Sequence, residues 1–239
     1  MRLLPFLLIA GLTLVMLAGE TDAEKEPLWS RDVAIGVTEV DISADGKYVV
    51  ASTYGGRLYL FENGNELWNY TTPGQSDVLS VAISANGEYV VVGSGYHDNK
   101  VYLFDKDNST PLWNYEPSPH DEGVTIGVES VAISADGEYI AAASEDSVFL
   151  FNKNNRTPLW SSGTGYDVVT VAISADGEYI AIGNLFGDKV YLFNKNNSSP
   201  IWSYKTGADV DSVAISADGE YIAAGGWNDK VYLFDKDNS

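Results

Sequence analysis

Apolar and polar residues alternate in a ten-residue stretch that recurs along the chain. VAISADGEYI occurs at Val131–Ile140, Val171–Ile180 and Val213–Ile222, and looser copies lie at Val40–Val49 and Val81–Val90. In each copy an apolar run leads to a polar turn that ends in Asp-Gly or Asn-Gly, and a second apolar run follows, which is typical of two strands joined by a tight turn. The leading valines lie 41, 50, 40 and 42 residues apart, close to the length of one propeller blade.

A third run follows in every repeat, and a fourth run follows in the first four. The third run is rich in β-branched and aromatic residues and predicts a strand at Leu58–Phe61, Val101–Phe104, Val148–Phe151, Val190–Phe193 and Val231–Phe234. The fourth run reaches a tryptophan at Trp68, Trp113, Trp160 and Trp202. The pattern therefore predicts an all-β protein, a β-propeller of five four-stranded blades with repeats starting near residues 38, 79, 129, 169 and 211.

The two ends of the repeat array complement each other. Trp29 lies in a fourth-strand pattern that has no first three strands before it, and the fifth copy stops before its own tryptophan strand. We expect Leu28–Arg31 to pair beside Val231–Phe234, so that the N-terminal strand closes the ring. The alternative is that the chain is a fragment of a larger propeller.

Residues 1–23 form a separate region. One arginine, Arg2, precedes an apolar run from Leu3 to Ala18, and small residues lie at Ala18, Gly19 and Ala23. The run is short for a membrane-spanning helix, so it predicts a secretory signal peptide, with an uncleaved anchor as the alternative. We therefore expect a secreted or cell-surface protein whose propeller domain covers residues 24–239.

The formal charge of −20 narrows the choice of partners. Such a surface repels nucleic acid and anionic lipid, so we predict a protein or glycan partner, no nucleic acid, and membrane contact only through an uncleaved N-terminal segment. The chain has no cysteine, which excludes disulfides and leaves blade packing as the source of stability.

The repeats resemble known propeller families. The Ser-x-Asp-Gly turn between two strands and the VYLF-like third strand, from Val131 to Phe151, look like WD-repeat and YVTN propellers. The continuation from Val101 to Tyr115, with its late tryptophan, is similar to quinoprotein-like (pyrroloquinoline-quinone type) repeats. The resemblance implies the fold and leaves several functions open. A quinone-binding dehydrogenase would need a vicinal disulfide or a cofactor-clamping set; the absence of cysteine removes the first, and we predict no cofactor.

Variation among the repeats is concentrated in the connections between the second and third strands. The Asp-Gly turns hardly change, whereas these connections differ in every copy, as expected of a recognition surface. Counting back from the third strand places a rim of large side chains at Tyr54, His97, Phe186 and Trp227. Aromatic rings at a channel mouth suit binding of a sugar or an apolar peptide, and they equally suit plugging of the channel.

Carboxylates precede the first strand of most repeats. They are Asp77, Glu129, Asp167 and Asp209. First strands line the channel of a propeller, so these groups are candidates for holding a cation or a basic ligand group, and capping of turns is the competing role. The chain has no calcium-type loop, and we predict no metal site.

Five asparagines lie in Asn-x-Ser/Thr sequons: Asn69, Asn108, Asn155, Asn196 and Asn197. In a secreted protein they are candidates for N-glycosylation, although turns rich in Asn, Ser and Thr also produce sequons by accident.

Catalysis has little support in the sequence. His97 and His120 lie on loops without a nucleophile motif, and the chain has no phosphate-binding glycine loop. We therefore predict no catalytic residues and a non-enzymatic binding or scaffold module that acts through the variable loops. The alternative is a lectin-like carbohydrate-binding protein or a sugar-active enzyme that uses paired carboxylates.

Overall fold

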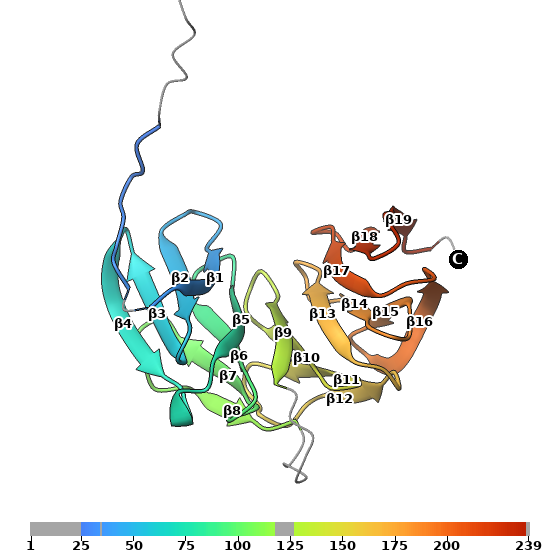
Figure 1. The fold of residues 1–239 in the computed structure, drawn as a ribbon, viewed down its shortest axis with the longest axis horizontal. Coiled ribbons are helices and arrows are strands. Elements are labelled where there is room, and N and C mark those ends of the chain that lie inside the picture. Colours follow the sequence, from blue (N-terminus) through green and yellow to red (C-terminus); the bar gives the residue numbers. More distant parts are fainter. Residues whose placement is uncertain (1–24, 34, 118–126, 238–239) are drawn as a thin grey trace, which may run out of the picture. The chain divides into compact units, whose positions relative to one another are not determined.

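The computed structural model describes residues 25–33, 35–117 and 127–237 (Figure 1). The chain divides into two compact units, Met1–Ser30 and Arg31–Ser239. Residues 25–30 carry no helix or strand. The predicted signal peptide at residues 1–23 lies outside the described residues.

The second unit is built from antiparallel sheets whose strands follow one another in chain order. The first sheet contains β1 (Val37–Ile42), β2 (Tyr48–Thr53), β3 (Arg57–Glu62) and β4 (Asn65–Thr71). The second contains β5 (Val78–Ile83), β6 (Tyr89–Ser94), β7 (Val101–Asp105) and β8 (Trp113–Tyr115), and a 3-10 turn, η1 (Pro73–Gln75), precedes it. The third contains β9 (Val128–Ile133), β10 (Tyr139–Ser144), β11 (Ser147–Asn152) and β12 (Trp160–Gly163).

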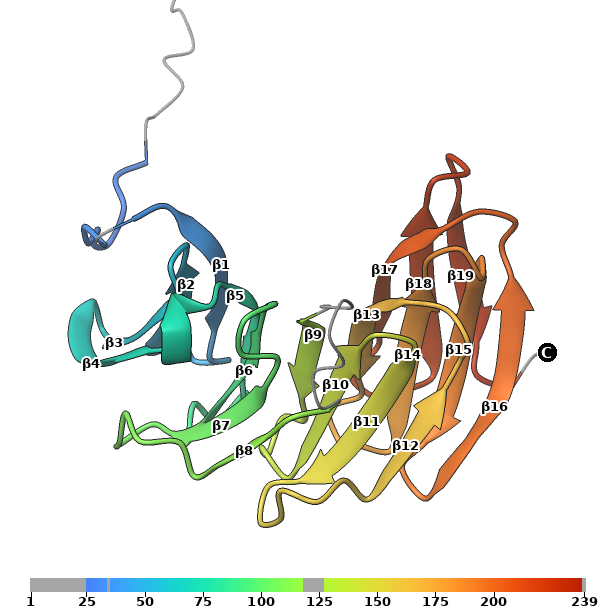
Figure 2. The same cartoon turned by 60° about the horizontal axis from the view of Figure 1, so that its bottom comes forward.

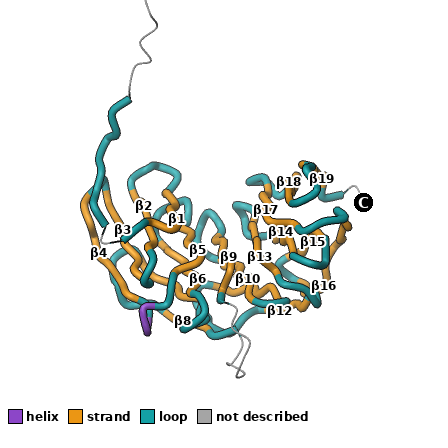
Figure 3. The backbone as a smooth tube through the Cα atoms, viewed as in Figure 1, coloured by secondary structure: helices purple, strands orange, loops and turns teal. Residues whose placement is uncertain are grey.

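The last two sheets lie side by side in Figure 2. The fourth contains β13 (Val168–Ile173), β14 (Tyr179–Asn184), β15 (Lys189–Asn194) and β16 (Asn197–Lys205). The fifth contains β17 (Val210–Ile215), β18 (Tyr221–Gly226) and β19 (Val231–Asp235). Figure 3 shows that nearly all of the structure between the strands consists of turns and short loops. The predicted all-β fold of five repeated sheets is confirmed.

The predicted closure is not seen. The fifth sheet contains three strands, and no strand is assigned within residues 25–33, where the closing strand was expected. Val231 and Leu233 of β19, which closure would bury, are exposed.

The core lies between consecutive sheets rather than within one sheet. One cluster joins Val50, Leu58 and Leu60 of the first sheet to Val90 and Tyr102 of the second. Equivalent clusters join the second sheet to the third, the third to the fourth, and the fourth to the fifth. Because a sheet cannot bury both faces by itself, each sheet depends on its neighbours for stability.

The regular tryptophan fastens one sheet to the next. The Trp113 indole Nε1 donates a hydrogen bond to the carbonyl oxygen of Lys153, 2.7 Å away in the following sheet. Trp68, Trp160 and Trp202 donate to Lys106, Lys195 and Lys236 in the same way. These indoles also lie against the phenylalanine of the neighbouring third strand, as Trp113 does with Phe151 at a centroid distance of 5.4 Å.

Candidate functional site: the variable loop end

The sheets have two ends, and hydrogen bonds within the Asp-Gly turns hold one of these ends in a fixed conformation. In the turn of the first sheet the Ser43 hydroxyl donates to the Asp45 carboxylate at 2.6 Å, and the Lys47 backbone N–H donates to the same oxygen at 3.0 Å. These two hydrogen bonds lower the pKa of Asp45. The Ser216 hydroxyl and the Glu220 backbone N–H lower the pKa of Asp218 in the same way.

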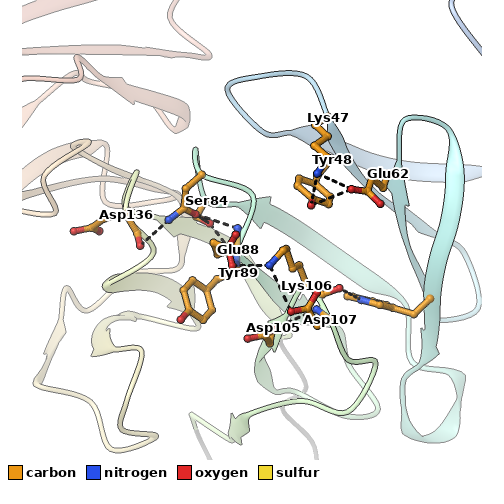
Figure 4. A network of polar contacts seen from close by, with 12 residues as sticks. Lys47, Tyr48, Glu62, Ser84, Glu88, Tyr89, Asp105, Lys106, Asp107 and Asp136 are labelled. Atoms are coloured by element: carbon orange, nitrogen blue, oxygen red, sulfur yellow. Dashed lines mark hydrogen bonds and ion pairs between the residues drawn. The ribbon is translucent and has the colours of Figure 1, made fainter.

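Lysines reinforce this end between the sheets. Lys195 pairs with Glu178 of its own sheet and lies 4.8 Å from the ring centre of Tyr139 in the preceding sheet. Lys153 repeats this arrangement with Glu138 and Tyr89. Figure 4 shows related networks in which Lys47 bonds Tyr48 and Glu62, and Lys106 bonds Glu88. These residues stabilise the fold, which explains why the turns that contain them hardly differ between the repeats.

The opposite end carries the variable connections and exposes large rings. Tyr54, Phe186 and Trp227 are 58%, 69% and 78% exposed, and His97, the fourth residue of the predicted rim, is also exposed. Ser144 takes the corresponding position in the third sheet and is buried. Among the described residues none of the four rim side chains makes a ring contact with another. The four predicted rim residues are therefore separate exposed side chains, and their role in binding stays a prediction.

Two of the predicted carboxylates hold these loops in place. The Asp77 carboxylate accepts a hydrogen bond from the Gly55 backbone N–H at 2.8 Å, and the Asp209 carboxylate accepts one from the Phe186 N–H at 2.7 Å. In both cases an acid before the first strand of one sheet fixes the loop of the preceding sheet. Phe186 itself has a left-handed backbone, with φ of 58°, which its hydrogen bond to Asp209 helps to maintain.

A cavity of about 340 Å³ lies between the second and third sheets at this end. It brings together three residues that the sequence singled out, His97, Asp77 and Glu129. Its other lining residues are Ser76, Leu79, Gly95, Tyr96 and Gly127. The structure does not bring Tyr54, Phe186, Trp227, Asp167 or Asp209 into this cavity.

Backbone packing shapes the floor of the cavity. A Cβ atom on Gly127 would lie 2.5 Å from the Cα of Gly95 and 2.7 Å from Leu79 Cδ1. The two glycines therefore allow the chains to approach closely and leave the Leu79 side chain, which is 38% exposed, as an apolar surface.

Glu129 carries the most informative charge in this cavity. Its partial burial raises the pKa of its carboxyl, and the negative charge of nearby Asp167 adds to the effect. Burial disfavours the charged form of Glu129 itself, and Asp167 disfavours it by like-charge repulsion, so a cation entering the cavity would favour the ionised carboxylate.

The loop that bears Tyr96 and His97 is built on a buried acid that the sequence reasoning missed. Asp98 is buried and accepts hydrogen bonds from Ser94 Oγ at 2.9 Å, Lys100 Nζ at 2.9 Å and Tyr102 Oη at 2.5 Å. Burial of the phenol, followed by its hydrogen bond to Asp98, raises the pKa of Tyr102 well above its usual range, so it remains a donor. The spacing of Ser94, Asp98 and Tyr102, four residues apart across a tight turn, was the available signal.

The same loop is tied to its neighbours. The Ser76 hydroxyl donates to the Gly95 carbonyl at 2.8 Å and accepts from the His97 backbone N–H at 3.3 Å. The Tyr96 and His97 rings meet edge to face at 4.6 Å. These contacts hold the two rings in a fixed arrangement at the cavity mouth before any ligand binds.

The remaining predicted residues do not add chemistry to this site. The sequon asparagines Asn108 and Asn155 lie in exposed turn segments, and Asn197 is the exposed first residue of β16. All three accept hydrogen bonds from backbone N–H groups two residues on. Asn69 and Asn196 are also exposed, and glycosylation at all five stays a prediction. Within the described ranges no group of three acidic or histidine residues is placed to hold a metal ion.

Comparison with known proteins follows the repeat pattern. The profile of the PQQ_2 family, described as outer membrane protein assembly factor BamB, matches residues 19–147. This match covers more than half of the chain. The chain belongs to the PQQ_2 repeat family. A second profile, the WD domain G-beta repeat, matches residues 198–235, and together the two matches confirm the predicted WD-repeat and quinoprotein-like resemblance.

A human protein shares part of this sequence. The chain is 32% identical over 144 residues to the U3 small nucleolar RNA-associated protein 18 homolog of Homo sapiens. The match covers 59% of this chain and 25% of the relative, so the chain spans about a quarter of that protein's length. Propeller repeats of the matched kinds generally bind proteins or act as scaffolds, and WD propellers are typically non-enzymatic.

This match corrects the predicted location. The sequence was interpreted as that of a secreted or cell-surface protein, with a membrane-anchored form as the alternative. The named human relative is, by its name, associated with a small nucleolar RNA, and this finding contradicts the predicted secretion. The apolar run at the N-terminus was the reason for the wrong prediction, because it fits the length and flanks of a signal peptide. In the described part of the chain, no helix has the length and apolar character needed to span a membrane.

Proposed function

We propose that this chain is a non-enzymatic protein-binding module that recognises its partner through the variable loop end. We take residues 24–239 as the propeller domain. The supporting observation is the contrast between the two ends of the sheets. Turns that hardly differ between the repeats, together with lysine pairs, occupy one end, whereas the other end exposes Tyr54, Tyr96, Phe186 and Trp227 on loops held by hydrogen bonds. Exposed aromatic side chains on rigid loops are the usual anchors of protein interfaces.

The preferred partner is a basic segment with apolar residues. The chain carries a formal charge of −20, which attracts basic segments and speeds their association. The cavity adds a specific element, because Asp77 and Glu129 lie with the apolar Leu79 and the Tyr96 ring. This combination suits one arginine or lysine side chain, whose stem packs on Leu79 while its cation meets the carboxylates.

The relative's name mentions RNA, and the net charge of this chain bears on whether it could bind RNA directly. A surface this acidic repels phosphate, so direct binding of RNA is disfavoured. A basic protein partner is compatible with the charge, including a protein that itself binds RNA. We therefore assign recognition to the protein component.

A peptide array tests this proposal. Basic peptides that contain aromatic or aliphatic residues should bind. Acidic peptides of equal length and equal apolar content should not bind. Trp227→Ala, and separately His97→Ala, should weaken binding about 10-fold or more, as expected for interface anchors. Leu159→Ala is the matched control, because Leu159 is similarly exposed but precedes β12, away from the variable loops.

Two outcomes would contradict the proposal. Equal binding of acidic and basic peptides would remove the role of charge. Unchanged affinity in both the Trp227 and His97 variants would place the partner elsewhere. Specific binding on a glycan array, lost in Trp227→Ala, would favour the carbohydrate-binding alternative instead.

A further inference from the structure

A hollow of about 360 Å³ lies at the edge of the second and third sheets, beside β8 and the turn between β11 and β12. Four of its lining residues come from β8, from the residue after it and from the residue before β7, and two come from the turn. They are Lys100, Asn114, Tyr115, Glu116, Arg156 and Thr157. None of them lines the cavity that contains Asp77 and Glu129, so this edge hollow is a separate site.

Arg156 stands out in the edge hollow because its charge is not used by the fold. Its side chain is exposed and makes no hydrogen bond or ion pair with any other described residue. Most lysines of the sheets are paired with an acid of their own sheet, as Lys153 is with Glu138. The chain has a formal charge of −20, so an unpaired guanidinium is unusual in it.

The turn that carries Arg156 does not need this side chain. The Asn155 side chain accepts a hydrogen bond from the Thr157 N–H at 3.0 Å, and the corresponding segments of the second and fourth sheets contain the same bond. Serine stands in place of Arg156 in both of those segments, at Ser109 and Ser198. The guanidinium therefore adds nothing to the turn and is available for a ligand.

The edge hollow differs from the corresponding places at the neighbouring junctions. Strand pairing aligns Lys100 with Arg57 of the first sheet and with Ser147 of the third. At the junction of the first and second sheets, Arg57 therefore has Ser109 as its counterpart, and at the junction of the third and fourth sheets both positions are serines. Of these three junctions, the one between the second and third sheets alone has a cation from each sheet.

Further hydrogen-bond donors accompany Arg156. Lys100 Nζ donates to Asp98 Oδ1 at 2.9 Å, and the ammonium group keeps two other N–H groups for a ligand. In the part of the chain that the structure describes, no hydrogen bond involves the Thr157 hydroxyl or the Asn114 amide. The lining thus offers donors of three chemical kinds in addition to the guanidinium.

The charges of the edge hollow match a ligand with one negative charge. Asp98 balances Lys100, which leaves Arg156 as the cation and Glu116 as the acid of the lining. A phosphate group carries a charge of about −1.5 to −2 at neutral pH, so Glu116 would repel its excess charge. A carboxylate carries one charge and accepts two parallel hydrogen bonds from a guanidinium. At physiological ionic strength the Debye length is about 8 Å, so the more distant acids of this chain are largely screened.

We propose that the edge hollow binds a carboxylate group, held by the Arg156 guanidinium and assisted by Lys100, Asn114 and Thr157. An acidic side chain of a partner protein and the C-terminus of a partner chain present the same group, and either would satisfy these donors. The proposal goes beyond the function proposed above and does not depend on it, because that function uses the variable loop end.

Two carboxylate probes and one control anion test the proposal on the whole chain. N-acetylglutamate N-methylamide presents a side-chain carboxylate, N-acetylglycine presents a C-terminal carboxylate, and inorganic phosphate is the control. Each is titrated at pH 7 and physiological ionic strength, and the Nε–H signal of Arg156 and the backbone amide of Thr157 are followed by NMR. At least one carboxylate should shift both signals to saturation and bind more tightly than phosphate. The tighter carboxylate probe identifies the source.

Variants of Arg156 show whether the guanidinium carries the binding. Arg156→Ser gives the turn the residue of its counterparts, so it should fold normally and lose affinity about 10-fold or more. Arg156→Lys keeps the charge without the planar fork and should lose less. Lys205→Gln is the matched control, because it removes an equal charge from a side chain that is 68% exposed on β16, and it should change affinity less than about 2-fold.

Three results would overturn the proposal. One is the absence of a saturable shift at Arg156 with both carboxylates. Another is tighter binding of phosphate than of either carboxylate. The third is an equal loss of affinity in Arg156→Ser and Lys205→Gln, which would show that general attraction by positive charge explains the binding.

Discussion

The indole Nε1 of Trp160 donates a hydrogen bond to the carbonyl oxygen of Lys195, 2.7 Å away in the next sheet. The same relationship recurs at every described junction, so the tryptophans fix the spacing of the sheets as well as filling the space between them.

Trp160→Phe tests that relationship. The change keeps an aromatic ring and removes the donor, so the Lys195 carbonyl loses its partner. We expect the free energy of unfolding to fall by about 1 to 2 kcal/mol, from the lost hydrogen bond and some lost packing. Trp227→Phe is the matched control, because Trp227 is 78% exposed and should change stability by less than about 0.5 kcal/mol. Urea unfolding of both variants makes the comparison, and equal losses would show that the bond contributes nothing.

The glycines of the Asp-Gly turns give a second paired test. Gly137 and Gly46 have nearly the same left-handed backbone, with φ of 77° and 74°. Alanine at either site costs about 1 kcal/mol for the backbone conformation. At Gly137 the new Cβ would also lie 2.4 Å from Tyr89, so we expect a total loss of about 2 to 4 kcal/mol there. Thermal unfolding that ranks the two variants equally would contradict this account of the junction.

This pair of glycines also shows where sequence reasoning ended. The Asp-Gly repeats predicted the turns, and the alternation of residues predicted the strands, because both depend on local conformation. Whether Gly46 or Val40 is covered depends on which sheets meet, and identical repeats carry no information about that. The cavity residues His97, Asp77 and Glu129 were each selected from the sequence for other reasons. That they share one cavity became visible only when the second and third sheets were placed side by side.

Asp98 is expected to control both stability and the shape of the binding loop. Asp98→Ala leaves Tyr102 Oη and Ser94 Oγ without their shared acceptor in a buried place, so we expect a loss of about 3 kcal/mol. Asp107→Ala, at an exposed position on a turn, should cost less than about 0.5 kcal/mol. Hydrogen exchange should show faster exchange at residues 95–99 in the Asp98 variant, and unchanged protection there would refute its role as the anchor of the loop.

Glu129 makes the stability of the protein fall as the pH rises, whereas Asp45, whose pKa is lowered, makes it rise. Burial, and then the charge of Asp167, raise the pKa of this carboxyl above its ordinary value of 4.5. The folded state therefore holds this proton more tightly than the unfolded state, so stability declines as the pH rises from about 4.5 through the folded pKa and is then constant. Glu129→Gln removes this penalty, and it should raise the melting temperature at pH 7 while leaving it unchanged at pH 4.

Asp45→Ala should behave in the opposite way. The pKa of Asp45 is lowered from 3.8, so its contribution is present at pH 7 and is lost as the pH falls through the folded pKa. If the cavity binds a cationic side chain as proposed, Glu129→Gln should also weaken binding of a basic peptide at pH 7. A variant that is more stable but keeps full affinity would contradict the proposed binding role of Glu129.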